Sequence, residues 1–236
     1  MSGRRRLSEV REGPIVTLDG PAGSGKSSTA KEVARRLGFR HLDSGALYRA
    51  LTLALLDRGV PEEQWANMSE ADLRDLGVSI TPTDQGFDVR IGASSVTTEL
   101  RDPEVTERVS QLASLPATRG CLLGLQRSAA GKGRLVADGR DMGTVVFPDA
   151  EVKVYLVADL EERARRRLRE IGPEAPSPGA LTEQVASIAE RDRRDLERPI
   201  SPLRMSKGAH LIDTTGLSFE EQVQAVVELV NRLTPP

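Results

Sequence analysis

One short segment of the chain has the spacing of a phosphate-binding loop. Residues 20–27 read Gly-Pro-Ala-Gly-Ser-Gly-Lys-Ser and fit the pattern G-x-x-x-x-G-K-[ST]. Glycines let successive backbone N–H groups converge on a phosphate, and the start of a following helix adds a favourable dipole. Lys26 can reach the outer phosphate oxygens, and Ser27 can offer its hydroxyl to Mg²⁺. The segment predicts nucleoside triphosphate binding without identifying the acceptor. The predicted loop residues are Gly20, Pro21, Ala22, Gly23, Ser24, Gly25, Lys26 and Ser27.

A second group of charged residues follows a short apolar run at 135–137. Asp138-Gly-Arg-Asp141 places two acids and a guanidinium within four residues. An aspartate at the end of a strand beside a phosphate loop lies near the magnesium, so Asp138 and Ser27 are the candidate metal ligands. Arg140 suits a phosphate because a guanidinium can bind two oxygens, and Asp141 could accept a hydrogen bond from the amino group of a base. A solvated ion-pair loop is the alternative.

Arginines also gather in two segments with helical composition. Arg191, Asp195 and Arg198 are spaced i, i+4 and i+7, so they share one helix face. The preceding helix carries a further basic cluster at Arg163 and 165–167. A basic pair of helices in an acidic protein predicts that a polyanion binds beside them. A mobile lid that carries arginines fits this description, because it would exclude water and neutralise the charge of a transferring phosphoryl group. Salt-bridged, exposed helices are the alternative.

The elements that must position these residues alternate between strands and helices. Short apolar runs with β-branched residues predict strands, and segments with helical spacing lie between them. Such alternation implies a mainly parallel sheet covered on both faces. We therefore expect an α/β protein, a P-loop three-layer α/β/α fold with a five-stranded core sheet. The strands are predicted at 15–18, 39–42, 135–137, 152–157 and 209–212.

Residues 61–100 differ from the flanking pattern. A short helical piece is followed by small strand segments, predicted at 78–81, 87–91 and 95–97, with turn signals between them. This indicates a small antiparallel β insert on the main domain. The predicted division is a flexible tail at 1–13, a P-loop core at 14–60 and 101–236 with a helical lid at about 161–190, and the insert at 61–100.

The composition excludes several classes of protein. The 33 Lys and Arg nearly balance the 35 Asp and Glu, giving a net charge of −2, which argues against general binding to nucleic acid or an anionic membrane. No run of ~18 apolar residues is present to span a membrane. Cys121 is the single cysteine, so neither an intramolecular disulfide nor a thiolate zinc cluster can form. We expect a cytoplasmic protein without a nucleic-acid or membrane partner.

Three further features are given no chemical role at this stage. His41 and His210, the two histidines, lie in no metal-binding or triad spacing and are interpreted as structural. Asp213-Thr-Thr-Gly216 matches a D-x-x-G pattern, but it lies near the C-terminus and no N-K-x-D sequence accompanies it. It is interpreted as a strand-to-helix loop. Arg49, on an otherwise apolar helix, is either a phosphate ligand or a surface arginine with a buried stem.

Four motifs together resemble those of bacterial cytidylate kinases, a family of nucleoside monophosphate kinases. In chain order they are DGPAGSGK at 19–26, LDSGALYR at 42–49, ADGRDMGTVVFP at 137–148 and ERDRRD at 190–195. The resemblance covers the chain from about Ile15 to the C-terminal helix. The 61–100 insert is similar to the enlarged monophosphate-binding region of this family.

The resemblance implies roles for individual residues. Ser28 would extend the loop that holds the phosphates of ATP. The implied catalytic residues are Lys26, Arg140, Arg191 and Arg198. The implied substrate-binding residues are a serine of the cytidylate site (Ser44), phosphate-binding arginines (Arg49, Arg140), groups that read cytosine (Ser110, Arg119, Asp141), groups that face the pentose (Arg191, Asp195) and an arginine between the phosphates (Arg198).

The expected reaction is transfer of the γ-phosphoryl group of ATP to CMP or dCMP, with Mg²⁺, by a monomer. Because the acceptor is an anionic phosphate oxygen, no general base is required, and positioning with charge neutralisation suffices. Two alternatives stay open. One is a P-loop kinase for another monophosphate or a small-metabolite acceptor, and the other is a nucleotide-binding switch without group transfer.

Overall fold

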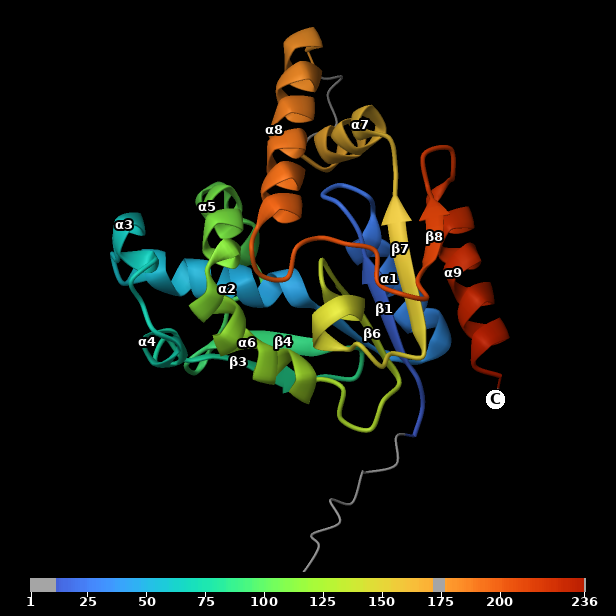
Figure 1. Ribbon diagram of the computed structural model, residues 1–236, viewed down its shortest axis with the longest axis horizontal. Helices are drawn as coiled ribbons and strands as arrows, with labels where there is room; N and C mark the ends of the chain where they lie inside the picture. Colours follow the sequence, from blue (N-terminus) through green and yellow to red (C-terminus); the bar gives the residue numbers. More distant parts are fainter. Residues whose placement is uncertain (1–11, 172–176, 236) are drawn as a thin grey trace, which may run out of the picture.

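A parallel sheet of five strands lies at the centre of the computed structural model, which describes residues 12–171 and 177–235. Its strand order is β2-β6-β1-β7-β8, and every neighbouring pair is parallel. The carboxyl ends of all five strands therefore meet at one edge, which is where open α/β sheets bind ligands (Figure 1). The strands are β1 (Ile15–Asp19), β2 (Arg40–Asp43), β6 (Leu135–Gly139), β7 (Val152–Val157) and β8 (His210–Asp213).

Helices cover both faces of this sheet and make the outer layers (Figure 1). Side chains of β1 alternate between the layers, with Ile15 in one apolar core and Val16 and Leu18 in the other. All three are fully buried, as expected for a central parallel strand. The layers consist of α1 (Lys26–Leu37) and α9 (Phe219–Leu233) on one face, and α2 (Ser44–Asp57), α5 (Pro103–Ser114) and α6 (Pro116–Ser128) on the other.

A small antiparallel sheet, in the order β3-β4-β5, forms the predicted β insert. It is not a separate body, because Trp65 and Val89 from this region share one apolar core with Leu47 of α2. The third strand is shorter than predicted and begins one residue earlier, and Val96, whose N–H still donates to the Val89 carbonyl at 3.1 Å, is buried. The elements of this region are α3 (Glu62–Trp65), α4 (Glu70–Arg74), β3 (Val78–Pro82), β4 (Phe87–Ile91), β5 (Ser94–Ser95) and the 3₁₀ turn η1 (Glu99–Arg101).

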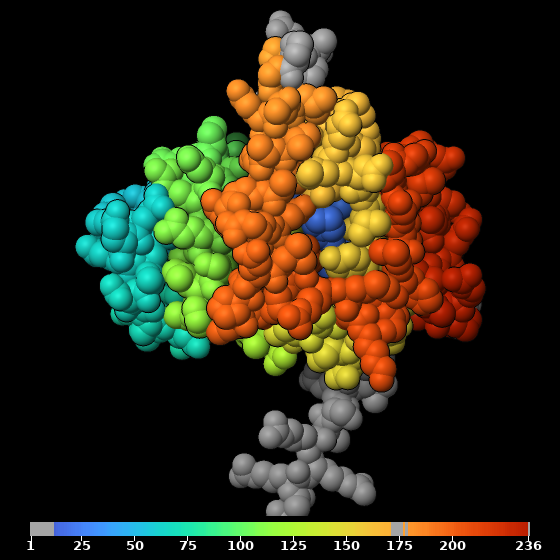
Figure 2. All heavy atoms as spheres, turned by 45° about the horizontal axis from the view of Figure 1, so that its top comes forward, coloured from blue at the N-terminus to red at the C-terminus, as the bar shows by residue number. Residues whose placement is uncertain are grey.

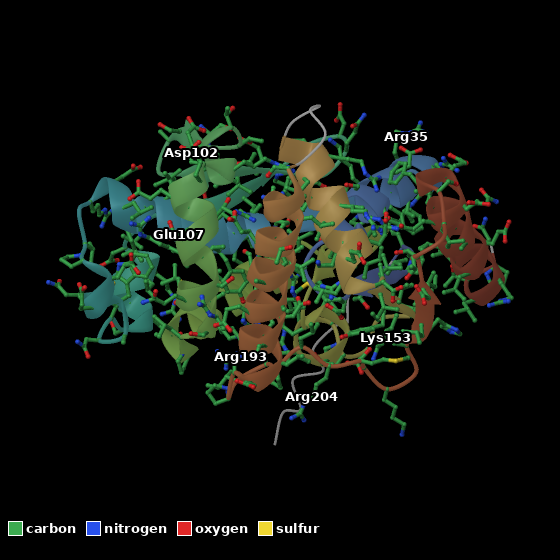
Figure 3. All side chains as sticks on the ribbon, turned by 90° about the horizontal axis from the view of Figure 1, so that it is seen from above. Arg35, Asp102, Glu107, Lys153, Arg193 and Arg204 are labelled. Atoms are coloured by element: carbon green, nitrogen blue, oxygen red, sulfur yellow. The ribbon has the colours of Figure 1, made fainter. Side chains whose placement is uncertain are left out.

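Two helices stand over the carboxyl edge of the parallel sheet. They are α7 (Leu160–Ile171) and α8 (Pro178–Glu197), which pack side by side (Figures 1 and 3). The second begins at Pro178, earlier than the predicted start at 181, because the Ser177 hydroxyl accepts a hydrogen bond from the Ala180 N–H and caps it. Residues 172–176 of the proline-rich loop predicted at 172–179, and residues 1–11 of the tail predicted at 1–13, lie outside the described residues.

The predicted fold class is confirmed, with small shifts of boundaries. The strand predicted at 39–42 runs one residue further, because Asp43 pairs in register with Asp138 of β6. The 213–216 segment is the predicted loop between β8 and α9, and the capping box of Ser218 and Glu221 opens α9. A π-helical turn, η2 (Met142–Val146), was not predicted. Within 12–171 and 177–235, no helix is both long and apolar enough to cross a membrane.

Leu18→Ala should destabilise the protein by about 2–5 kcal/mol. Leu18 is fully buried in the central strand, so the change removes apolar contacts and leaves a cavity between β1 and the α1/α9 layer. Urea denaturation followed by circular dichroism measures the loss. Leu211→Ala is the matched control, because Leu211 is 58% exposed on the edge strand β8 and its truncation should stay within about 0.5 kcal/mol. Equal losses in the two variants would contradict the packing described here.

Candidate active site

The loop between β1 and α1 adopts a conformation that depends on glycine. Gly23 and Gly25 have φ values of 73° and 82°, in the left-handed region, where other residues are strained. A Cβ atom at Gly20 would lie 2.2 Å from the Leu156 carbonyl oxygen, so the loop passes directly against β7. The loop opens into the N-terminus of α1 at Lys26, which is the arrangement that the motif predicts for anion binding.

Lys26 is buried at the start of α1 and lies among other cations. Its ammonium donates to the Pro21 carbonyl at 3.0 Å. Its pKa is lowered to about 7, mainly by burial and also by the nearby charges of Arg140 and Arg191, against the opposing influence of Asp138 and Asp195. A lysine in this setting carries a positive charge readily only when anions are near.

Asp138, at the end of β6, connects two elements. Ser27 donates its hydroxyl to Oδ2 of Asp138 at 2.5 Å, and Nε2 of His41 lies 2.8 Å from Oδ1. The structure thus brings the two predicted metal ligands together. The His41 ring, interpreted from the sequence as structural, contacts the carboxylate of that pair. Burial lowers the pKa of His41, but the hydrogen bond and charge of Asp138 outweigh burial and raise it overall.

Three arginines and one carboxylate form the centre of the site. Nε of Arg140 donates to Asp195 at 2.8 Å, and Nη1 of Arg198 lies 3.3 Å from the other carboxylate oxygen. The Nε atom of Arg191 is buried without a hydrogen-bond partner in the described part of the chain, as is Nη2 of Arg198. The pKa of Arg191 is lowered to about 10, mainly by burial and also by the charges of Arg140 and Arg49. The cluster therefore carries more positive charge than Asp195 balances.

Beside this cluster, Asp141 makes an ion pair with Arg119 of α6. Nη2 of Arg119 lies 2.5 Å from the Asp141 carboxylate, and Nη1 donates to the Ala113 carbonyl at 2.9 Å. The guanidinium also lies over the ring of Tyr48, 5.4 Å from its centroid. Both members of the pair are buried. Two of the three residues that the resemblance assigns to cytosine, Arg119 and Asp141, thus lie together, 22 positions apart in the sequence.

The remaining predicted residues lie on helices that face this region. Ser44, the first residue of α2, accepts a hydrogen bond from Nε2 of the buried Gln126 at 2.7 Å. Arg49 donates to the Thr106 hydroxyl at 2.9 Å, so its guanidinium turns inward rather than lying on the surface. Ser110 lies half-buried on α5, which packs against α2 and α8.

The helices over the sheet edge hold the phosphate loop from outside. The Ala22 N–H donates to Asp192 of α8 at 2.9 Å, and Arg163 of α7 donates to the Ala22 carbonyl at 2.9 Å. Arg163 and Asp192 also form a buried ion pair with one another. Figure 2 shows atoms of the blue, N-terminal part of the chain at the bottom of a hollow between α7 and α8. The helices therefore both border the site and fix one of its loops.

These groups fit a nucleotide polyphosphate and a divalent cation. Unpartnered guanidinium N–H groups and a buried lysine with a lowered pKa are satisfied by phosphate oxygens. Ser27 and Asp138 offer the hard oxygen ligands that Mg²⁺ prefers. The described residues contain no group of three or more His, Cys, Asp or Glu side chains that could hold a metal by themselves. Mg²⁺ commonly completes its coordination with water and substrate phosphate.

Sequence reasoning missed several supporting residues. Asp19 accepts the N–H groups of Met142 and Gly143 at 2.8 Å each, and so fixes the π turn that follows Asp141. Burial raises the pKa of Asp19 to about 6. Asp192 and Gln126 were also not assigned. Asp19 and Asp192 lie inside the motifs at 19–26 and 190–195, so the sequence could have indicated that they belong to the site. Nothing in the sequence distinguished Gln126.

Comparison with known proteins decides the family. The family model for cytidylate kinase matches residues 16–232. The chain belongs to the cytidylate kinase family. A cytidylate kinase of Carboxydothermus hydrogenoformans is 42% identical over 217 residues, which cover 92% of this chain and 97% of the relative. One from Exiguobacterium sibiricum is 44% identical over 217 residues, which cover 91% and 95%.

Membership of the cytidylate kinase family confirms the predicted resemblance and the predicted activity. The chain is an ATP-dependent phosphotransferase, and the family supports CMP as the acceptor. The matched cytidylate kinases give no support to the alternatives of another acceptor or a non-catalytic switch.

The lowered pKa of Lys26 predicts a pH dependence of stability in the nucleotide-free protein. Between about pH 7 and pH 10.5 the unfolded chain holds a proton on this lysine that the folded chain has released. The unfolded state then binds more protons, so raising the pH favours folding. Lys26→Met should reduce this rise in the free energy of unfolding between pH 7 and pH 9, as measured by urea denaturation. Lys31→Met, on the exposed side of α1, is the control and should keep the wild-type slope. Identical slopes in all three proteins would contradict the assignment.

Proposed function

We propose that this chain transfers the γ-phosphoryl group of ATP to CMP or dCMP, and that the residues brought together at the carboxyl edge of the sheet perform the transfer. The observation that carries the proposal is the excess of buried positive charge. Arg140 and Arg191 lie within electrostatic reach of Lys26 on the phosphate loop, and Arg140 directly precedes Asp141 of the Asp141–Arg119 pair. That is the position in which two phosphate groups, one from each nucleotide, would meet.

On the donor side, residues 20–28 would hold the phosphates of ATP. Backbone N–H groups of the loop and the N-terminus of α1 face the anion, and Lys26 neutralises its outer oxygens. Ser27 and Asp138 would hold Mg²⁺, which when bound neutralises charge on the phosphate oxygens. The helices α7 and α8 exclude water on this side, because their Arg163–Asp192 pair holds the loop at Ala22.

On the acceptor side, the buried Asp141–Arg119 pair would read the cytosine edge, with Ser44 and Ser110 nearby. An ionised carboxylate only accepts hydrogen bonds, so Asp141 suits the amino group of cytosine and not the carbonyl oxygen that uracil carries there. Arg49 and Arg140 would bind the acceptor phosphate. Asp195 and Arg191 would face the pentose, and Arg198 would lie between the phosphates. No base is needed, because the attacking phosphate oxygen is already anionic.

The proposal includes the predicted organisation of the chain. The 61–100 region would serve as the monophosphate-binding insert, and α7 with α8 as the lid at about 161–190. We infer a monomer that acts in the cytoplasm on CMP, dCMP and ATP, without a nucleic-acid or membrane partner. The nearly balanced charge of the chain supports the absence of a nucleic-acid or anionic-membrane partner, because proteins that bind such polyanions usually carry a strong excess of basic residues.

An assay of ADP release tests the proposed acceptor. With Mg·ATP, turnover should be strong with CMP and dCMP and weaker with UMP, because Asp141 accepts a hydrogen bond from the amino group of cytosine and uracil carries a carbonyl oxygen there. Turnover with AMP should be negligible. Absence of turnover with every monophosphate would overturn the acceptor site, and equal turnover with CMP and UMP would overturn the role of Asp141.

Arg140→Ala should lower kcat by about 10²–10³-fold, because one charged donor to the transferring group is lost. The free energy of unfolding should change little, since the change also relieves repulsion from Lys26 and Arg191. Steady-state kinetics with CMP and urea denaturation measure both. Arg193→Ala on α8 is the control: its side chain lies at the surface, paired with Glu190 and Glu197 (Figure 3), and its loss should leave kcat unchanged. A kcat/KM within about threefold of wild type in Arg140→Ala would refute its role.

A further inference from the structure

We propose that His41 is a positioning residue for magnesium-nucleotide binding: it fixes the carboxylate of Asp138 in the orientation that Ser27 and Mg²⁺ require. The inference rests on the proposed function of residues 20–28 and deepens it by adding a residue from outside that loop. His41 lies on β2, the edge strand, and belongs neither to the phosphate loop nor to the charged segment after β6.

Hydrogen bonding to both oxygens of Asp138 is the first observation. Ser27 reaches Oδ2 at 2.5 Å and Nε2 of His41 reaches Oδ1 at 2.8 Å. Because an ionised carboxylate only accepts hydrogen bonds, both partners act as donors. A carboxylate held at one oxygen can rotate about its Cβ–Cγ bond, whereas one held at both cannot. His41 therefore defines the plane of the Asp138 carboxylate.

The main chain of His41 is itself held on two sides. On one side β2 runs parallel to β6, with His41 opposite Val136 and Asp43 opposite Asp138. On the other side the His41 N–H donates at 3.1 Å to the Gln85 carbonyl, in the turn between β3 and β4. The turn approaches closely, since a Cβ atom at Gly86 would lie 2.6 Å from the His41 carbonyl oxygen. The imidazole therefore projects from a fixed backbone, as a positioning group must.

Burial gives this contact its importance. Asp138 is 1% exposed, so water cannot replace a lost donor at Oδ1 without entering the site. A buried carboxylate oxygen without a partner is costly, and the group would turn toward another donor nearby. Lys26 is within electrostatic reach of Asp138 and is the cation that the phosphates need. Loss of the His41 contact thus weakens the orientation of Asp138 toward the metal. Outer partners of metal ligands typically contribute about 10–100-fold in metal affinity or activity.

Two amide substitutions at His41 test whether the contact with Asp138 depends on the length of the side chain rather than on its polarity. In His41→Gln the side-chain nitrogen can occupy the place of Nε2 and donate to Asp138. In His41→Asn the same amide is one methylene shorter and falls short of Oδ1. Both variants keep a polar side chain on an edge strand, so both should fold, which urea denaturation verifies. His210→Asn, at the other histidine, on the opposite edge strand β8, is the control.

Isothermal titration of the nucleotide-free proteins with ADP, once with Mg²⁺ and once with EDTA, measures the contribution of the metal directly. We expect His41→Asn to bind Mg·ADP about tenfold or more weakly than wild type, and ADP in EDTA with unchanged affinity. His41→Gln and His210→Asn should match wild type in both titrations. In steady-state kinetics, His41→Asn should raise KM for Mg·ATP and leave KM for CMP unchanged.

The proposal is overturned if His41→Asn binds Mg·ADP as tightly as wild type. It is equally overturned if the affinity for ADP falls by the same factor with and without Mg²⁺, or if His41→Gln does not restore the affinity for Mg·ADP. Either result would mean that His41 only packs against its neighbours. The proposed function is tested separately by wild-type turnover with CMP. If wild type phosphorylates CMP and His41→Asn binds Mg·ADP as tightly as wild type, only the role of His41 is refuted. If His41→Asn loses affinity for ADP only in the presence of Mg²⁺ but wild type does not phosphorylate CMP, the proposed acceptor is refuted instead.

Discussion

Mutual repulsion among buried cations is the constraint around which the rest of the site is arranged. Burial lowers the pKa of Lys26 and of Arg191, and the nearby charge of Arg140 adds to this effect at both residues. A cluster of this kind is unfavourable without anions. The fold holds it together with carboxylates from different elements, Asp138 at the end of β6 and Asp195 on α8. Phosphate groups can neutralise the positive charge that these carboxylates leave unbalanced, so the repulsion among the cations would increase the affinity for phosphate.

Strands β1 and β7 and helices α7 and α8 hold the phosphate loop and the turn after β6 in fixed positions. The middle strand β1 delivers the phosphate loop, and its last residue, Asp19, also accepts two backbone N–H groups of the π turn after β6. The loop itself is held against β7 at Gly20 and against α7 and α8 at Ala22. Because these contacts come from a close-packed core, small displacements at one point are transmitted to the others. Distances between the phosphate loop and the arginines are therefore set by the whole three-layer packing.

The sequence alone predicted the groups of the site but not their pairing. The phosphate loop and the i, i+4, i+7 spacing on α8 are local patterns, so they could be recognised directly. That Arg140 would meet Asp195, 55 positions later, depends on where α8 lies over the sheet, and no local pattern contains that information. The contact between His41 and Asp138 was not predicted for the same reason, because it crosses from β2 to β6 and depends on their register. The functional roles of the individual residues stay predictions that the experiments above test.

The arrangement around Arg140 explains how one guanidinium can be held and yet remain able to bind a phosphate. Its Nε atom donates to Asp195, and Nη1 lies 3.4 Å from the Gly139 carbonyl. Within the described residues, Nη2 has no hydrogen-bond partner. A guanidinium presents its five N–H groups in a fixed plane, so a bond at one edge orients the opposite edge. Asp195 therefore steadies Arg140 without competing for the edge that would meet the phosphate, and the ion pair organises the site before substrate binds.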